Sequence, residues 1–200
     1  MGTRRAVQHF LVPCIIGLVL TWASATPAAE EGVVAGRVEA TPTKYLEETV
    51  VYLKTSPSAR SPRSFDIDQK GMKFIPHVQA IAKGDTVRFL NHDGVDHNVY
   101  SPEGGFNLGM IPKDKSAEQK FDAPGAITLL CSVHPEMLGY VFVAPTPYSA
   151  VVDKTGRYKI GHVPPGSYQV AVWNSHLKSP EASATVAPGK AAQVDFSVKR

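Results

Sequence analysis

Short apolar runs separated by polar turns dominate the chain, and no window repeats its apolar positions every three to four residues. Without that period we expect no long helix. The runs are bounded by Gly, Pro, Asn or Asp, which is typical of β-strands joined by turns. We expect strands at residues 32–38, 49–54, 65–67, 86–91, 98–100, 126–131, 139–143, 150–152, 157–160, 167–173, 182–186 and 193–198. Short strands at this spacing predict an all-β protein built from β-sandwiches.

The first 25 residues follow the three-part pattern of a secretory signal peptide. Arg4 and Arg5 form a basic start, residues 10–23 are mostly apolar, and small residues at 23–25 offer a cleavage site. The adjacent arginines leave twin-arginine export open. The apolar run is shorter than a membrane-spanning helix needs. We therefore expect a periplasmic or secreted protein with no membrane span in its mature form.

Composition narrows the chemistry mainly through cysteine. The 200 residues carry a formal net charge of only +3, and no stripe of Lys and Arg interleaves with aromatic residues, so we expect no nucleic-acid partner. Cys14 lies within the signal peptide, and Pro13 before it does not fit a lipid-anchored cysteine. Cys131 is then the single cysteine of the mature chain and has no internal disulfide partner. It is a buried inert thiol, an intermolecular link or a ligand.

Cys131, His134 and Met137 stand at three-residue spacing on the loop between two predicted strands. Cys131 at a strand end can point inward, and the short spacings let His134 and Met137 turn back toward it. A thiolate, two imidazoles and a weak thioether are the donors of a blue-copper site. The second imidazole must come from elsewhere in the chain, and His97, at the start of a strand, is the candidate.

Four stretches, one of which holds the Cys, His and Met, carry a family resemblance. They are Phe74-Ile75-Pro76, then AKGDTVRFLN at 82–91, then His97-Asn98-Val99, followed by Cys-x-x-His-x-x-Met with Pro135 after His134. On these motifs residues 63–144 resemble a cupredoxin, a plastocyanin- or amicyanin-like blue-copper domain, and the ligand spacing is most like amicyanin.

The resemblance implies a Greek-key β-sandwich that binds one copper ion, cycling between Cu(I) and Cu(II). It implies His97, Cys131 and His134 as equatorial ligands and Met137 as the axial one. Asn98 would tie the two ligand loops together by hydrogen bonds, which orient ligands and tune a metal.

Alternatives remain open at single positions. Met137 is a packing residue in one of them, with Met110 or a backbone carbonyl as the axial neighbour, and His92 competes with His97 as the remote ligand. Surface or turn positions are expected for His77, His162 and His176. Zinc is disfavoured because a thioether is not among its usual ligands. One cysteine and six histidines after processing are too few for a dinuclear thiolate-bridged or a trinuclear copper centre.

The C-terminal part carries a second resemblance. Asp-x-x-Gly-x-Tyr and Pro-Pro-Gly-x-Tyr turns within residues 148–173 resemble the carboxypeptidase regulatory-like family, a small prealbumin-like β-sandwich. Strands that normally open that family have counterparts at Gly36-Arg37-Val38 and at residues 50–53, ahead of the cupredoxin-like part. That family pattern holds no catalytic residues.

We therefore expect a cupredoxin domain inserted into a second sandwich, because each flank alone is too short for a core and insertion at a loop tip is tolerated. The expected units are a signal peptide at 1–25, a cupredoxin domain at 63–144, and a regulatory-like sandwich from 30–56 with 146–200. Tandem packing, with residues 32–55 in the cupredoxin sheet, is the alternative.

The functional prediction is an exported type 1 copper protein that carries single electrons between redox partner proteins and is not an enzyme. A cysteine hydrolase would need a base, an orienting group and an oxyanion site that the motif does not supply. By the resemblance, His134 is the electron port. The alternatives are a copper protein for sensing, delivery or storage, and a ligand-binding module with a vestigial copper domain.

Overall fold

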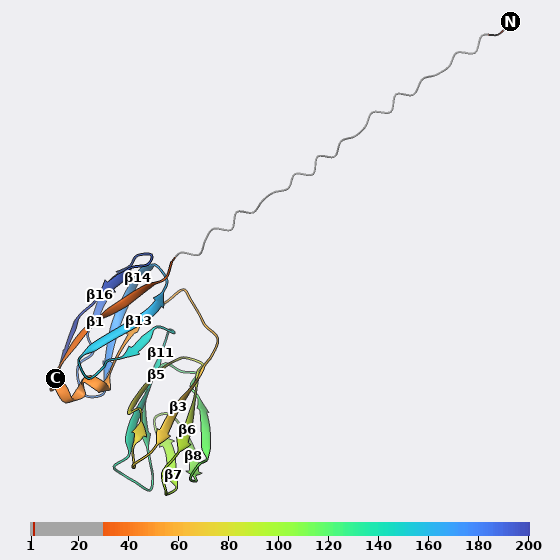
Figure 1. Cartoon of the computed structure of the whole chain (residues 1–200), viewed down its shortest axis with the longest axis vertical. Helices are drawn as coiled ribbons and strands as arrows, with labels where there is room; N and C mark the ends of the chain where they lie inside the picture. Colours follow the sequence, from red (N-terminus) through yellow and green to blue (C-terminus); the bar gives the residue numbers. More distant parts are fainter. Residues whose placement is uncertain (1, 3–29) are drawn as a thin grey trace.

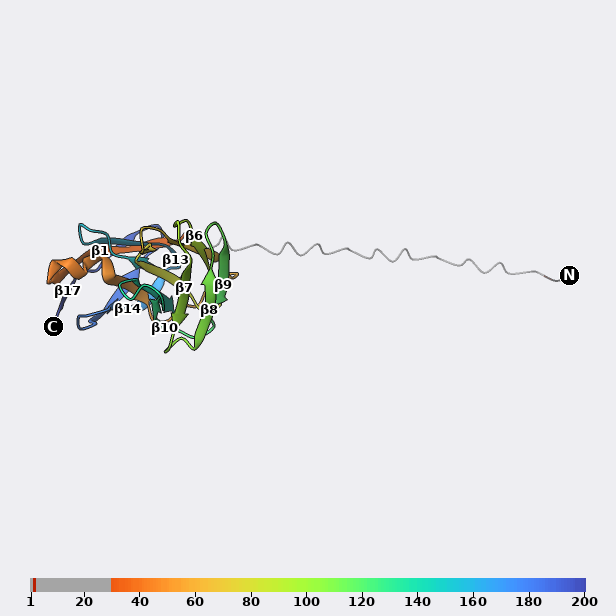
Figure 2. The same cartoon turned by 90° about the horizontal axis from the view of Figure 1, so that it is seen from below.

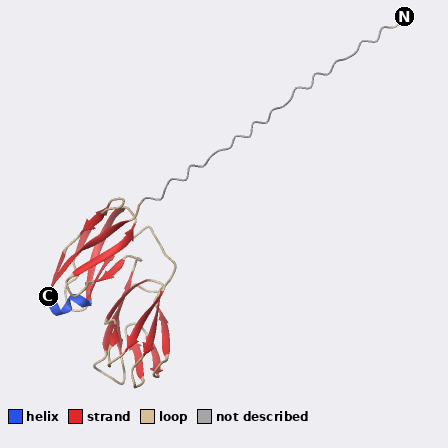
Figure 3. Cartoon of the chain, in the orientation of Figure 1, coloured by secondary structure: helices blue, strands red, loops and turns tan. Residues whose placement is uncertain are grey.

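A computed structural model of the chain describes Gly2 and residues 30–200. Apart from Gly2, the predicted signal peptide at 1–25 lies outside the described residues. The fold is all-β as predicted, with seventeen strands and one short 3-10 helix, η1 (Thr43–Glu48), in the described part (Figure 3). Within that part no helix is long and apolar enough to cross a membrane.

Nine of the strands form a first sandwich of two sheets (Figure 1). The five-stranded sheet has the order β5 (Val78–Ala82), β11 (Leu138–Ala144), β10 (Gly125–Leu130), β7 (His97–Ser101) and β8 (Phe106–Ile111). The four-stranded sheet has the order β4 (Phe74–Ile75), β3 (Ser64–Gln69), β6 (Thr86–Asn91) and β9 (Ser116–Lys120).

The other eight strands form a second sandwich. One sheet has the order β12 (Ser149–Val151), β2 (Thr49–Leu53), β14 (Gly166–Asn174) and β15 (Glu181–Val186). The other has the order β13 (Arg157–Val163), β1 (Gly32–Thr41) and β16 (Ala191–Gln193), with β17 (Phe196–Lys199) also paired to β1. Figure 2, seen from below, places β1 and β17 at one side of the molecule and β6 and β9 at the other.

The segment before the first sandwich pairs with the segment after it. β1 runs antiparallel to β13 and parallel to β16 and β17, and β2 runs antiparallel to β12 and β14. Inward residues from both segments, such as Val34, Val51, Ile160 and Val172, share one core cluster. Two stretches separated by more than 90 residues therefore bury one hydrophobic core, whose stability depends on their pairing.

The two sandwiches touch through the outer faces of two sheets. Phe142 and Val78 pack with Val50 in a third apolar cluster. Trp173 stacks on Phe142 with ring centroids 5.3 Å apart, and Tyr52 approaches the same ring at 4.9 Å. β2 is thus buried on both faces, which explains its continuous run of Val, Val, Tyr and Leu at residues 50–53.

The predicted strand at 193–198 is wrong as one unit, because it divides into β16 and β17. Asp195 Oδ1 accepts the Arg37 N–H at 2.7 Å, a donor that a regular ladder would use. The chain also passes so close to Gly36 that an added Cβ would lie 1.8 Å from the Val194 carbonyl oxygen. The side-chain hydrogen bond of Asp195 and the close approach of Val194 to Gly36 interrupt the strand at residues 194 and 195.

A buried carboxylate holds the segment that enters the first sandwich. The Arg60 guanidinium donates to both oxygens of fully buried Asp85, at 2.7 and 2.5 Å. The Arg63 and Ala82 N–H groups donate to the same carboxylate at 2.8 Å each. Burial by itself raises the pKa of Asp85, but these bonds and the Arg60 charge outweigh it and lower the pKa below its ordinary value.

Asp85→Asn should destabilise the protein at neutral pH by about 3 kcal/mol, the lower end for a broken buried pair, because Arg60 keeps some solvent contact. A lowered folded-state pKa gives stability that is present above the unfolded pKa of about 4 and is lost as the pH falls below it. Urea unfolding of both proteins between neutral and acid pH measures this. The difference in unfolding free energy between the two proteins should shrink below about pH 4. A difference that does not change with pH would contradict the stabilising role of the ionised Asp85 carboxylate.

Candidate metal centre

Three neighbouring strands of the five-stranded sheet bring the predicted ligands to one end of the first sandwich. β10 is antiparallel to both β7 and β11, with Leu130 opposite Tyr100 on one side and Leu138 on the other. Cys131 directly follows β10, Met137 directly precedes β11, and His97 is the first residue of β7. Antiparallel pairing therefore places the end of β10 beside the starts of its two neighbours.

His97, Cys131 and His134 form the one group of three or more His, Cys, Asp or Glu side chains in the described chain whose ligand atoms all lie within 4.8 Å of one another. His97 Nδ1 lies 3.0 Å from His134 Nδ1, and Cys131 Sγ lies 3.8 Å from the same nitrogen. The two imidazole rings are inclined at 64° with centroids 4.7 Å apart. The three donor atoms are thus close enough together to hold one metal ion.

Most of this group is shielded from water. His97 is fully buried, Cys131 is 3% exposed and Met137 is 1% exposed, whereas His134 is partly exposed. Cys131 and Met137 share the core cluster of the first sandwich. The Met137 N–H donates to the His134 carbonyl at 3.0 Å, which closes the loop into a tight turn.

Asn98 links the two ligand segments, as the family resemblance implied. Its backbone N–H donates to Cys131 Sγ at 3.4 Å, and its side-chain oxygen accepts the Ser132 N–H at 3.3 Å. Its side-chain nitrogen donates to Asn107 Oδ1 at 2.8 Å and to the Gly109 carbonyl at 3.0 Å. One buried side chain therefore ties β7, β8 and the β10–β11 loop together.

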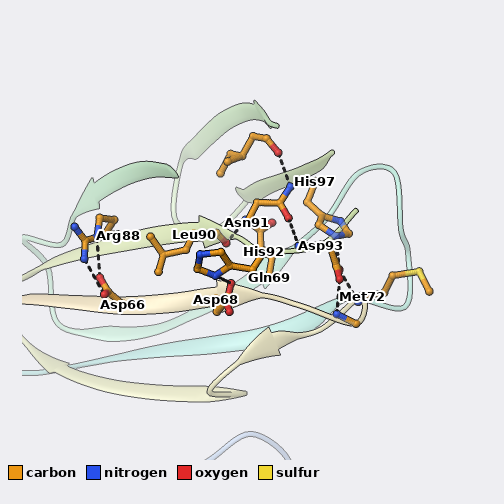
Figure 4. Close-up of polar contacts among 12 residues, drawn as sticks. Asp66, Asp68, Gln69, Met72, Arg88, Leu90, Asn91, His92, Asp93 and His97 are labelled. Carbon is orange, nitrogen blue, oxygen red and sulfur yellow. Dashed lines mark hydrogen bonds and ion pairs between the residues drawn. The ribbon is translucent and has the colours of Figure 1, made fainter. Parts of the chain in front are cut away.

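Asp93 is a site residue that the sequence did not indicate. Its Oδ2 lies 2.7 Å from His97 Nε2, on the side of the ring opposite Nδ1 (Figure 4). Burial raises the pKa of Asp93, but hydrogen bonds from the Met72 and Gly71 N–H groups and from His97 outweigh it and lower the pKa. An aspartate four residues before a histidine in a glycine-containing loop is common, so the sequence carries no signal for this contact.

The competing residues lie elsewhere. His92, the rival to His97, is half exposed and contacts Asp68 Oδ1 at 2.9 Å. Met110, the rival to Met137, has an exposed fraction of 48%. The other histidines of the described residues contact carboxylates at partly or largely exposed positions: His77 and His176 at Glu48, and His162 at Glu31.

The donor set fits a thiophilic transition metal. Metal bonds to nitrogen and sulfur of about 2.0–2.3 Å keep the ligand atoms of one ion within about 4.6 Å of each other, close to the spread observed here. A Cys with two His, in a buried site beside a Met, is the donor combination that suits copper. The fold and the site together define an all-β protein with a mononuclear metal-binding sandwich.

Comparisons with known proteins agree with this class. Residues 63–144 match the family described as copper binding proteins, plastocyanin/azurin family. Amicyanin from Paracoccus versutus is 31% identical over 77 residues, which are 36% of this chain and 58% of amicyanin. The chain thus spans less than two thirds of that relative's length.

Two solved structures are also similar. One is a Cu(I) form of an amicyanin variant, with 26% identity, a TM-score of 0.38, and coverage of 40% of this chain and 81% of amicyanin. The other is a purple cupredoxin from Nitrosopumilus maritimus, with 26% identity, a TM-score of 0.37, and coverage of 40% and 99%.

Residues 63–144 are thus similar to the copper-binding family of plastocyanin and azurin, the cupredoxins. This family binds one copper ion, and the group of His97, Cys131 and His134 is a place in the domain that can hold it. From here on, residues 63–144 are called the cupredoxin domain, and the strands outside them the second sandwich.

Asn98→Ala should lower the free energy of unfolding of the metal-free protein by about 1–2 kcal/mol, because it removes three partly buried hydrogen bonds of the amide, whose partners lie on exposed residues and can bind water instead. Urea denaturation measures the change. Ser132→Ala is the matched control, since only the backbone of Ser132 contacts Asn98. Equal stability of the two variants would show that the Asn98 side chain does not hold the loop.

Proposed function

We propose that this protein is an exported type 1 copper protein that carries one electron at a time between redox partner proteins. The observation that carries the proposal is the convergence of His97, Cys131 and His134 within 4.8 Å at one end of a cupredoxin domain. The signal-peptide pattern at 1–25 supports export to the periplasm or beyond.

The residues that would hold the copper ion are His97, Cys131, His134 and Met137, with the Met137 thioether as the weakest donor. Copper at such a site supplies one-electron chemistry by alternating between Cu(I) and Cu(II). The protein's part is to keep the donors in place in both states: His97 and Cys131 are fixed by strands, and Asn98 bridges their segments. Little rearrangement is then needed when the charge changes.

His134 is the proposed electron port, since it is the one ligand with solvent access. All the exposed large hydrophobic residues of the described chain belong to the cupredoxin domain: Met72, Ile75, Val95, Met110, Val133 and Leu138. Val133 is the neighbour of His134 in sequence, and Leu138 follows Met137. Exposed apolar surface beside a site is typical of protein contacts, which supports docking of a partner at this end.

We also propose that the cupredoxin domain is inserted in a regulatory-like β-sandwich formed by residues 30–56 with 146–200. The pairing of β1 with β13 and of β2 with β14 supports this division. The second sandwich packs on the outer face of β5 and β11. Its role would be that of a scaffold or interaction platform, and we assign it no peptidase activity.

Addition of Cu(II) to the metal-free mature protein should give one bound copper per chain and an intense visible band from thiolate-to-copper charge transfer. The band should bleach with a reductant and return with an oxidant. Cys131→Ser should remove it, whereas His92→Ala should keep it, because His92 contacts Asp68 instead of the site. Tight copper binding without reversible bleaching would favour delivery or storage over electron transfer.

Met137→Leu should keep the visible band and raise the reduction potential, because it removes a weak donor that helps to stabilise Cu(II). Direct electrochemistry of the copper-loaded variants measures this. Met110→Leu is the matched control and should leave the potential unchanged, since Met110 is half exposed on β8. If the reduction potential shifts in Met110→Leu and stays unchanged in Met137→Leu, Met110 is the thioether ligand and Met137 is a packing residue.

A further inference from the structure

A carboxylate outside the donor set contacts the buried histidine of the site. Asp93 Oδ2 lies 2.7 Å from His97 Nε2, while Nδ1 of the same ring faces His134. The His97 side chain is fully buried and that of Asp93 is only 16% exposed. The negative charge of the Asp93 carboxylate therefore acts more strongly on its neighbours than a surface charge would, because solvent and salt screen it less.

The Asp93 carboxylate is held by a turn of the four-stranded sheet, whereas His97 belongs to the five-stranded sheet. The Gly71 N–H donates to Oδ1 at 2.7 Å, from the turn between β3 and β4. The Met72 N–H, from the same turn, donates to Oδ2 at 2.9 Å (Figure 4). Two consecutive N–H groups that converge on one carboxylate form an anion-binding concavity. Met72 has a φ of 53°, a left-handed conformation that residues other than glycine rarely adopt.

Asn91 fixes the loop that carries Asp93. Its side-chain oxygen accepts the Asp93 N–H at 2.9 Å, and its side-chain nitrogen donates to the carbonyls of Val95 and Ile111 at 2.9 and 2.8 Å. Asn91 itself is fully buried. The place of Asp93 is therefore set by its own loop, by β8 and by the β3–β4 turn, independently of its contact with His97.

We propose that Asp93 is a positioning residue of the copper site, which orients His97 and stabilises Cu(II) relative to Cu(I). The inference rests on the proposed function, because it gives Asp93 a role toward copper bound at His97. A carboxylate accepts hydrogen bonds only, so Nε2 carries the ring proton and Nδ1 keeps a lone pair for the metal. The negative charge beside the ring makes His97 a better donor, and it favours the ion of higher charge.

Asp93→Asn keeps the size of the side chain and removes the charge. It should weaken Cu(II) binding to the metal-free protein by about 10–100-fold and Cu(I) binding less. The reduction potential then rises by about 59 mV for each tenfold difference between the two. Competition titrations with both ions and electrochemistry measure this. Asp96→Asn, which removes an exposed carboxylate next to His97, is the control. It should leave the affinities for Cu(II) and Cu(I) and the reduction potential unchanged.

A loop contact without influence on copper would give a different pattern. Asp93→Asn would then lower the urea stability of the metal-free protein but match Asp96→Asn in potential, which would overturn the proposal while leaving the blue-copper function intact. Absence of reversible visible absorption in the unmodified protein would instead overturn the proposed function.

A measurement on the unmodified protein covers the case in which Asp93→Asn does not fold. In the Cu(I)-loaded protein, NMR should show a slowly exchanging proton on His97 Nε2. Rapid exchange of that proton with solvent would overturn the proposal.

Discussion

Strand β11 is buried on both faces, and the rest of the structure depends on that constraint. Val141 and Val143 point into the core of the cupredoxin domain, whereas Phe142 and Ala144 point into the contact with the second sandwich. Met137 directly precedes the strand, so the same backbone that joins the sandwiches also positions one end of the site. A shift of β11 by one residue would exchange its two faces and displace the loop from Cys131 to Met137. The fold and the metal centre are therefore specified by one strand register.

The strands that the hydrophobic pattern did not predict share a position. β4, β5, β8 and β9 are the four edge strands of the cupredoxin domain. An edge strand has one paired neighbour, and β9 stays largely in solvent, so the sequence of β9 needs few apolar residues. In β9 the exposed positions alternate with Ala117 and Gln119, neither of which is strongly apolar. Central strands such as β6 and β14 bury alternate residues on a core, and their pattern was sufficient to place them.

Part of the site could likewise be predicted from the sequence, and part could not. Cys131, His134 and Met137 lie within seven residues, so their spacing alone indicated a shared loop, and the structure places His97 beside Cys131 and His134. Asp93 follows β6 of the four-stranded sheet, beside the β3–β4 turn that carries Gly71, and it contacts His97 of the five-stranded sheet. Such contacts depend on how two sheets face each other, and that arrangement leaves no periodic trace in the chain.

Two hydrogen-bond systems act on the proposed copper ligands in opposite directions. The Asn98 N–H donates to Cys131 Sγ and withdraws negative charge from the sulfur, which favours Cu(I), since bonding around that sulfur tunes the potential. Asp93 accepts from His97 and adds negative charge to the imidazole, which favours Cu(II). Cys131 as a thiolate and Asp93 as a carboxylate together balance the charge of Cu(II) and leave an excess negative charge with Cu(I). Because water is largely excluded here, that excess is poorly screened. The β3–β4 turn, which holds Asp93, therefore acts on the reduction potential without touching a ligand.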